Sequence, residues 1–234
     1  MNRCHALLVI AGLAAVLQAA RAGEITGTVT LKGTPPPEKE ITPLKDDPNC
    51  GKLQASTPMT HFYVAGPKGE LGDVVVSLKG VSGKSTGATA SPAMLDQKNC
   101  LYSPYIMAVQ TDQKILIRTS DPVLHNVHTQ PAVAGNTEMN QAQMEKAPDI
   151  TYSASKPEEF LKFKCDVHPW MFAYVSVFDH PYFAVTGKDG TFKIANVPAG
   201  KYTIEASHRK AGKATQEIEV KEGETKVELT LEAK

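Results

Sequence analysis

The sequence has no excess of charge of either sign. Its 234 residues contain 25 lysines and arginines against 25 aspartates and glutamates, spread along the chain. This balance gives no electrostatic case for binding nucleic acid or an anionic membrane. A glycine-rich phosphate loop and an alternation of strands with helices are also missing, which excludes a nucleotide-binding α/β fold. Function must therefore be inferred from a local site.

Long apolar runs are equally scarce. The longest, at residues 6–17, is too short to span a membrane easily, since a spanning helix needs roughly 20 apolar residues. Arg3 precedes this run, and Ala20-Arg21-Ala22 follows it with the small-x-small spacing of a cleavage signal. We predict that residues 1–22 are a cleaved signal peptide and that the protein is periplasmic or secreted; the alternative is an uncleaved anchor. Loss of Arg3 and Arg21 leaves 23 basic and 25 acidic residues, a formal charge of −2.

Cysteine is rare, and its count is informative. The chain has four cysteines, and removal of Cys4 with the signal peptide leaves Cys50, Cys100 and Cys165. In an oxidising compartment two of the three are expected to pair. We assign the disulfide to Cys50 and Cys100, because "DDPNCGK" and "DQKNCLYSP" are loop-like, whereas Cys165 has metal-ligand neighbours. The alternative is that both are free thiols.

Alternation with a period of two, the pattern of half-buried strands, is abundant. It is clear at residues 24–33, where Ile25, Val29 and Leu31 share one face. We predict an all-β protein of sandwich architecture. Residues 136–148 suit a short helix or an irregular loop, and residues 81–93 are too small and polar for a buried element. The other strand-like runs are 72–80, 105–110, 114–119, 125–130, 158–166, 171–178, 190–197, 200–207, 216–223 and 225–233.

One short segment concentrates side chains that bind metals. In "KFKCDVHPWMFAYV", Cys165, His168 and Met171 follow one another at spacings of three, between two predicted strands. A thiolate, an imidazole and a thioether form a soft donor set that favours copper over Mg²⁺ or Ca²⁺. The blue-copper arrangement requires a second imidazole. Upstream, "SDPVLHNVHT" offers His125 and His128, and the pattern alone leaves the choice between them open.

Two other chemistries fit these residues less well. Structural zinc sites prefer two or more thiolates and make no use of methionine. A cysteine nucleophile would need a histidine base, a group to orient that base and an oxyanion pocket, and nothing in the sequence signals such a pocket. We therefore expect no catalytic residues and no enzyme activity.

The two segments together resemble the cupredoxins, the type 1 blue copper family that includes amicyanin and plastocyanin. The likeness covers roughly residues 100–179 and is carried by "HNVH" and by "CDVHPWM", which has the Cys-x-x-His-x-x-Met spacing of amicyanin. It implies a Greek-key cupredoxin β-sandwich that holds one type 1 copper ion. It also implies that Asn126 joins the ligand segments by hydrogen bonds around the sulfur. The implied ligands are His125, Cys165, His168 and Met171.

One position departs from amicyanin, which carries proline before the loop histidine. Here that residue is Val167, which keeps its backbone N–H. If the loop keeps the family's turn, this N–H can donate to the Cys165 thiolate, withdraw electron density from sulfur and raise the reduction potential. We therefore expect Val167 to tune the site from outside the ligand set.

The ligand set predicts electron transfer, because all four positions around copper are filled by protein. We expect a one-electron carrier between redox partner proteins, such as a cytochrome or a dehydrogenase. His168 is the expected electron port, and Pro169, Trp170 and Phe172 form an apolar docking patch or pack against the next domain. The alternative function is a copper carrier or sensor. In that case His128 with Met139 and Met144 offers a second copper position.

The C-terminal part is similar to the carboxypeptidase regulatory-like, transthyretin-type β-sandwich. The likeness is carried by Thr186, Gly190 and Phe192 in a T-x-x-x-G-x-F pattern and by "VPAGKYTIEA". Residues 181–234 supply only about five strands, which is marginal for a separate core. We therefore predict insertion: residues 23–82 and 181–234 form a second small β-sandwich, and residues 83–180 form a cupredoxin domain between them. The alternative places the N-terminal strands in the cupredoxin sheet.

Overall fold

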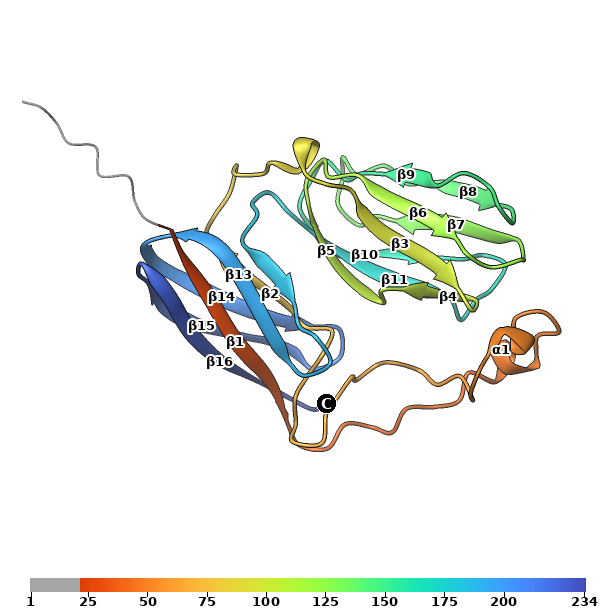
Figure 1. Cartoon of the computed structure of the whole chain (residues 1–234), viewed down its shortest axis with the longest axis horizontal. Helices are drawn as coiled ribbons and strands as arrows, with labels where there is room; N and C mark the ends of the chain where they lie inside the picture. Colours follow the sequence, from red (N-terminus) through yellow and green to blue (C-terminus); the bar gives the residue numbers. More distant parts are fainter. Residues whose placement is uncertain (1–21) are drawn as a thin grey trace, which may run out of the picture.

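The structure is a computed structural model that describes residues 22–234. The predicted signal peptide lies outside these residues except for Ala22, and it stays a prediction. The described chain is all-β, as predicted, and forms two β-sandwiches (Figure 1). No helix formed by residues 22–234 has the length and apolar character of a membrane span.

The first sandwich, here called the cupredoxin-like sandwich, uses the middle of the chain. One sheet has the order β5-β11-β10-β7-β8, and the other has the order β4-β3-β6-β9. β5 pairs in parallel with β11, and β3 pairs in parallel with β6, so these two pairs are joined by crossovers and not by hairpins. The strands are β3 (Ala93–Lys98), β4 (Leu101–Ser103), β5 (Ile106–Gln110), β6 (Ile115–Thr119), β7 (His125–Gln130), β8 (Asn140–Gln143), β9 (Ile150–Tyr152), β10 (Glu158–Lys164) and β11 (Phe172–Phe178).

The second sandwich combines the two ends of the described chain. Its sheets have the orders β13-β1-β16 and β12-β2-β14-β15. The N-terminal strands β1 and β2 are therefore interior strands, each flanked by C-terminal strands on both sides. The strands are β1 (Ala22–Lys32), β2 (Val75–Lys79), β12 (Phe183–Val185), β13 (Thr191–Pro198), β14 (Gly200–His208), β15 (Gly212–Val220) and β16 (Gly223–Glu232).

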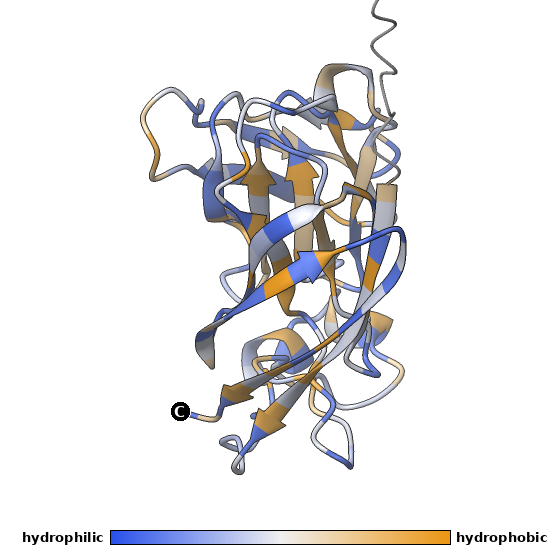
Figure 2. Cartoon of the chain, turned by 90° about the vertical axis from the view of Figure 1, so that its left-hand side faces the viewer, coloured by the Kyte–Doolittle hydropathy of each residue, from blue (hydrophilic) through white to orange (hydrophobic). Residues whose placement is uncertain are grey.

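Each sandwich has its own apolar core. Hydrophobic and hydrophilic positions alternate along many strands (Figure 2), so each sheet can bury one face. Ile25, Val29, Leu78 and Ile194 belong to the core of the second sandwich, which therefore draws on both ends of the chain. The core of the cupredoxin-like sandwich includes Leu95, Ile117, Val127, Leu161 and Phe163.

The T-x-x-x-G-x-F pattern joins the C-terminal strands to the N-terminal ones. The Thr186 hydroxyl donates to the Leu71 carbonyl at 2.8 Å and accepts from the Val74 N–H at 3.0 Å. Gly190 has a φ of +72°, and a Cβ there would lie 2.6 Å from the Val29 carbonyl oxygen. This position therefore requires glycine both for its backbone conformation and for close packing.

Between β1 and β2 the chain leaves the second sandwich. Residues 33–62, here called the strap, run beside the cupredoxin-like sandwich and carry the short helix α1 (Thr42–Asp46) (Figure 1). The predicted disulfide between Cys50 and Cys100 is present and fastens the strap just before β4. Leu44 and both half-cystines are fully buried in a small third core.

Charged and aromatic contacts connect the two sandwiches. The Arg209 guanidinium lies 3.9 Å from the centre of the Tyr174 ring. Glu159 accepts from the Ser207 hydroxyl at 2.5 Å and pairs with the Lys213 ammonium at 2.6 Å. The two bodies thus meet through β10 and β11 on one side and β14 and β15 on the other.

Several short elements differ from the sequence expectation. Residues 136–148, expected to form a short helix or an irregular loop, are irregular on either side of the short strand β8, and α1 was not predicted. Strands β3, β4, β9 and β12 were also missed. All but β3 span only three residues, too few to display a period, and β3 mixes polar and apolar residues.

Candidate metal centre

Two neighbouring strands and one loop bring the predicted ligands together. His125 begins β7, and Cys165 immediately follows β10, which pairs with β7. The loop closes through two backbone bonds, from the Cys165 N–H to the Met171 carbonyl at 3.0 Å and from the Met171 N–H to the His168 carbonyl at 2.9 Å. These bonds turn the chain so that its three sulfur- and nitrogen-bearing side chains lie at one end of the sandwich.

The donor atoms converge on one buried point. The Nδ1 atoms of His125 and His168 are 3.1 Å apart, and Cys165 Sγ is 3.7 Å from His168 Nδ1. One donor atom from each of these three residues lies within 4.8 Å of the other two. The exposed fractions are 0% for His125, 2% for Cys165 and 7% for His168, while Met171 beside them is 0% exposed.

These separations fit a single metal ion. A metal ion of this kind bonds to nitrogen at about 2.0–2.1 Å and to sulfur at about 2.3 Å. Angles of roughly 105–120° at the metal would then place two nitrogens roughly 3.2–3.6 Å apart, and a nitrogen and a sulfur roughly 3.5–3.8 Å apart. The observed 3.1 Å and 3.7 Å are close to both ranges. A buried His/Cys/His group with a methionine is a donor set compatible with copper.

Backbone N–H groups surround the sulfur. The Asn126 N–H donates to Cys165 Sγ at 3.4 Å, and the Asn126 side-chain oxygen accepts from the Asp166 N–H at 2.8 Å. Burial raises the pKa of Cys165, but its contact with His125 and the N–H groups of Asn126, His168 and Val167 outweigh burial and lower that pKa. The site thus favours the thiolate, which is the form that binds metal.

The two imidazoles differ in their electrostatic surroundings. Burial and the neighbouring His125 lower the pKa of His168 and so favour its neutral, metal-binding form. Burial also lowers the pKa of His125, but contacts with Asp121 and Cys165 outweigh it, so that this pKa is raised. The difference arises because the acidic partners Asp121 and Cys165 bond to His125 and raise its pKa, whereas burial and His125 dominate at His168.

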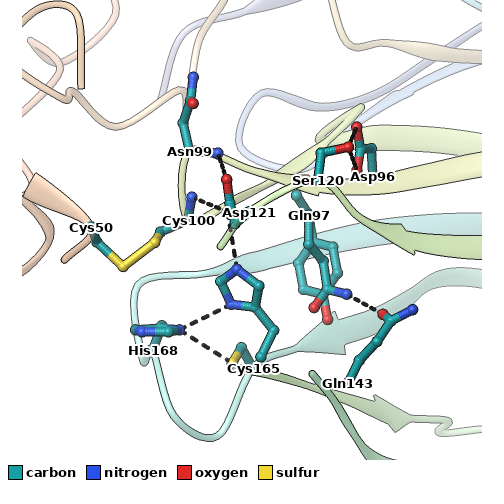
Figure 3. A network of polar contacts seen from close by, with 12 residues as sticks. Cys50, Asp96, Gln97, Asn99, Cys100, Ser120, Asp121, Gln143, Cys165 and His168 are labelled. Carbon is teal, nitrogen blue, oxygen red and sulfur yellow. Dashed lines mark hydrogen bonds and ion pairs between the residues drawn. A yellow bond between two sulfur atoms is a disulfide. The ribbon is translucent and has the colours of Figure 1, made fainter. Parts of the chain in front are cut away.

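That carboxylate was not predicted from the sequence. Asp121 is 4% exposed, and its Oδ2 lies 3.0 Å from Nε2 of His125. The same carboxylate accepts from the N–H groups of Asn99 and Cys100 at 2.6 and 2.7 Å (Figure 3). The available sequence signal was an aspartate four residues before a candidate ligand, a spacing that predicts contact on a helix but not at the start of a strand.

The strap covers the loop histidine. Sulfur atoms of Cys50 and Cys100 and a ring nitrogen of His168 all lie within 4.8 Å of one another. The Trp170 ring lies 5.2 Å from the His168 ring, and its Nε1–H donates to the Cys100 carbonyl at 3.1 Å. His168, the expected electron port, is therefore 7% exposed beneath the disulfide and the strap.

His128 points away from this cluster. Its Nδ1 lies 2.8 Å from the Asp166 carboxylate and its Nε2 lies 2.7 Å from Glu138. Both ring nitrogens are therefore occupied by contacts with carboxylates. Met144 is 61% exposed, and the buried metal-binding groups found among residues 22–234 do not include His128. The structure thus brings His125, rather than His128, to Cys165 and His168.

An apolar pocket opens beside the covered histidine. It has a volume of about 530 Å³, and Pro169, Trp170 and Phe172 line one side. Residues of the strap, among them Ile41 and Met59, line the other side. The three residues expected to form a docking patch therefore lie together on the surface of the pocket.

Comparison with known proteins finds similarity to two kinds of β-sandwich protein. The family model for the second beta sandwich domain of BOS complex subunit NOMO1-like proteins matches residues 181–233. A copper-containing nitrite reductase from Thermus scotoductus SA-01 is 14% identical with a TM-score of 0.33, over 38% of this chain and 22% of the reductase. A Cu(I) variant and an oxidized variant of amicyanin are each 16% identical over 44% of this chain and 97% of theirs, with TM-scores of 0.33 and 0.34. No curated protein sequence matches the chain.

Proposed function

We propose that the protein is an exported, non-enzymatic carrier of single electrons between redox partner proteins. One type 1 copper ion would be held by His125, Cys165 and His168, with Met171 as a weak fourth donor. The observation that carries this proposal is the buried convergence of two imidazole nitrogens and one sulfur at 3.1 and 3.7 Å. Copper bound there supplies a one-electron couple between Cu(I) and Cu(II).

The protein's own residues favour transfer of electrons over transformation of a substrate. Cys165 and Met171 are buried in the apolar core of the sandwich, so water and small substrates have little access. Asn126 links the two ligand segments from both its backbone and its side chain. Ligands that are held in place by such hydrogen bonds change their positions little between the two oxidation states, which suits electron transfer.

The partner is proposed to dock at the apolar pocket. Trp170 lies both in the lining of this pocket and 5.2 Å from the His168 ring, so it connects the covered histidine to the surface. Pro169 and Phe172 extend the apolar contact area. A redox protein that presents a small apolar projection would reach the indole there without displacing the strap.

A visible spectrum of the copper-loaded protein tests the proposal. We expect an intense thiolate-to-copper absorption that Cys165→Ser abolishes, together with reversible one-electron voltammetry. Retention of the colour in Cys165→Ser would overturn the ligand assignment. Rapid surrender of copper to an acceptor protein, without reversible voltammetry, would instead identify a copper carrier, and failure to retain any copper would identify a metal-free interaction protein.

A further inference from the structure

Asp121 occupies an unusual position between the disulfide and the metal centre. Its Oδ2 accepts from the Cys100 N–H at 2.7 Å and lies 3.0 Å from Nε2 of His125, while its Oδ1 accepts from the Asn99 N–H at 2.6 Å. The carboxylate is 4% exposed, so it is bonded to these groups and has little contact with water. Figure 3 shows it on the side of the disulfide, above the cysteine and histidine of the ligand loop.

A carboxylate oxygen is an acceptor, so it selects which ring nitrogen of His125 carries the proton. The contact requires hydrogen on Nε2, since two acceptors cannot form the bond. Nδ1 is then left with its lone pair, and this is the atom that faces His168 Nδ1 at 3.1 Å. The geometry thus directs the free lone pair of His125 into the ligand cluster.

We infer that Asp121 is the positioning residue of the metal centre: it fixes the Nε2-protonated tautomer and the ring orientation of His125. The inference rests on the proposed copper site and extends it by one residue. Carboxylate partners of metal-binding histidines typically contribute 10- to 100-fold to metal affinity. The same carboxylate accepts from the N–H groups of Asn99 and Cys100. The orientation of the His125 ring therefore also depends on the segment that carries the disulfide.

The backbone at this segment shows why a fixed carboxylate is required. Asn99 and Cys100 both have positive φ, 55° and 54°, a conformation that such residues adopt only with support. Asp121 binds both N–H groups, and the Trp170 indole binds the Cys100 carbonyl at 3.1 Å. Asp121 is therefore held by the turn that it stabilises, and it presents a fixed oxygen to His125.

The ring-nitrogen NMR signals of the metal-free protein, recorded at a pH where His125 is neutral, test the inference directly. Wild type should carry hydrogen on Nε2, Asp121→Ala should show a mixture of tautomers, and Asp121→Asn should retain Nε2–H through its amide oxygen. Copper affinity should fall about 10- to 100-fold in Asp121→Ala and less in Asp121→Asn. Asp96→Ala is the matched control: within residues 22–234 the Asp96 carboxylate accepts only from the Ser120 hydroxyl, at 2.9 Å, so its loss should leave both readouts unchanged.

Three results would overturn the inference. Hydrogen on Nδ1 of His125 in wild type would do so even if Asp121→Ala failed to fold. An unchanged tautomer in a folded but less stable Asp121→Ala would show that the carboxylate only caps the Asn99–Cys100 turn. An unchanged copper affinity would show that the orientation does not matter for binding. If wild type bound no copper, the proposed function would fail, whereas the tautomer measurement would still decide the role of Asp121.

Discussion

The ring of Trp170 packs 5.2 Å from the ring of His168, and its indole N–H is bonded to Cys100. A histidine that follows a strand on a surface loop is thereby enclosed by an aromatic ring on one side and a disulfide on the other. The strap is thus part of the enclosure of the candidate metal centre, although none of its residues is a proposed ligand. Its contribution can be measured without any metal.

Removal of the disulfide should open this enclosure. The bond closes a loop of 50 residues, which corresponds to about 4 kcal/mol of chain entropy. In metal-free Cys50→Ala/Cys100→Ala the Cys165 thiol should react with a thiol reagent more than about tenfold faster than in wild type. The reason is that about 1.4 kcal/mol changes the equilibrium between the closed and the open strap tenfold. The same variant with Cys165→Ser added measures any reaction at Cys4, which is then subtracted. Equal rates with and without the disulfide would show that the strap does not restrict access.

His125→Ala and His128→Ala should differ sharply in copper binding. His125 is fully buried beside Cys165 and His168, whereas both ring nitrogens of His128 contact the carboxylates of Asp166 and Glu138. Loss of His125 should abolish the thiolate-to-copper absorption, and loss of His128 should leave most of its intensity. The two variants are compared at equal copper loading by visible spectroscopy and metal analysis. Equal damage from both changes would mean that both histidines bind copper.

Val167→Pro should lower the reduction potential and keep the colour. The Val167 N–H is among the groups that lower the pKa of Cys165, so it withdraws electron density from the sulfur. Proline has no N–H, so in the variant the Cys165 thiolate keeps more electron density and stabilises Cu(II) better. Voltammetry of the copper-loaded variant gives the shift, with Val167→Ala as the control that keeps the N–H. An unchanged potential in a coloured Val167→Pro would show that this N–H does not reach the sulfur.

Acid should weaken the contact between the sandwiches through Glu159. Burial raises the pKa of this carboxyl, but hydrogen bonds from Lys213 and Ser207 outweigh burial and lower it. Its contribution to stability is therefore complete above the unfolded pKa of about 4.3 and is lost as the pH falls through the lower folded value. Because the side chain is 42% exposed, the effect should not exceed about 1 kcal/mol.

Urea unfolding of wild type and Glu159→Gln measures this contribution. The wild type should lose more free energy of unfolding than the variant between about pH 7 and pH 3. Lys213→Gln should reduce the same pH-dependent difference, because it deletes the charged partner of Glu159 and leaves only the Ser207 hydroxyl bonded to it. Identical pH dependence in wild type and Glu159→Gln would contradict the assignment of the ion pair.

Local patterns in the sequence were sufficient to predict the fold class and the ligand segments. Cys165, His168 and Met171 are close in the chain, so their spacing was visible without any knowledge of tertiary structure. Asp121 reaches His125 only because the turn at Asn99 and Cys100 holds the carboxylate in place, and no spacing encodes that turn. The strap over His168 was missed for a similar reason. Its position depends on a disulfide and a small core that join segments 50 residues apart.

The interior position of β1 has a consequence for the order in which the chain can fold. β1 pairs in parallel with β16, so that Thr26 bonds to Glu224 across 198 residues of sequence. Contacts of such separation form slowly, because the loop between them must first be closed. All strands of the cupredoxin-like sandwich lie within that loop, so it can assemble while the second sandwich is still open. Newly made protein would thus acquire its ligand cluster early, and β1 would find its two partners, β13 and β16, only after the whole cupredoxin-like sandwich had emerged.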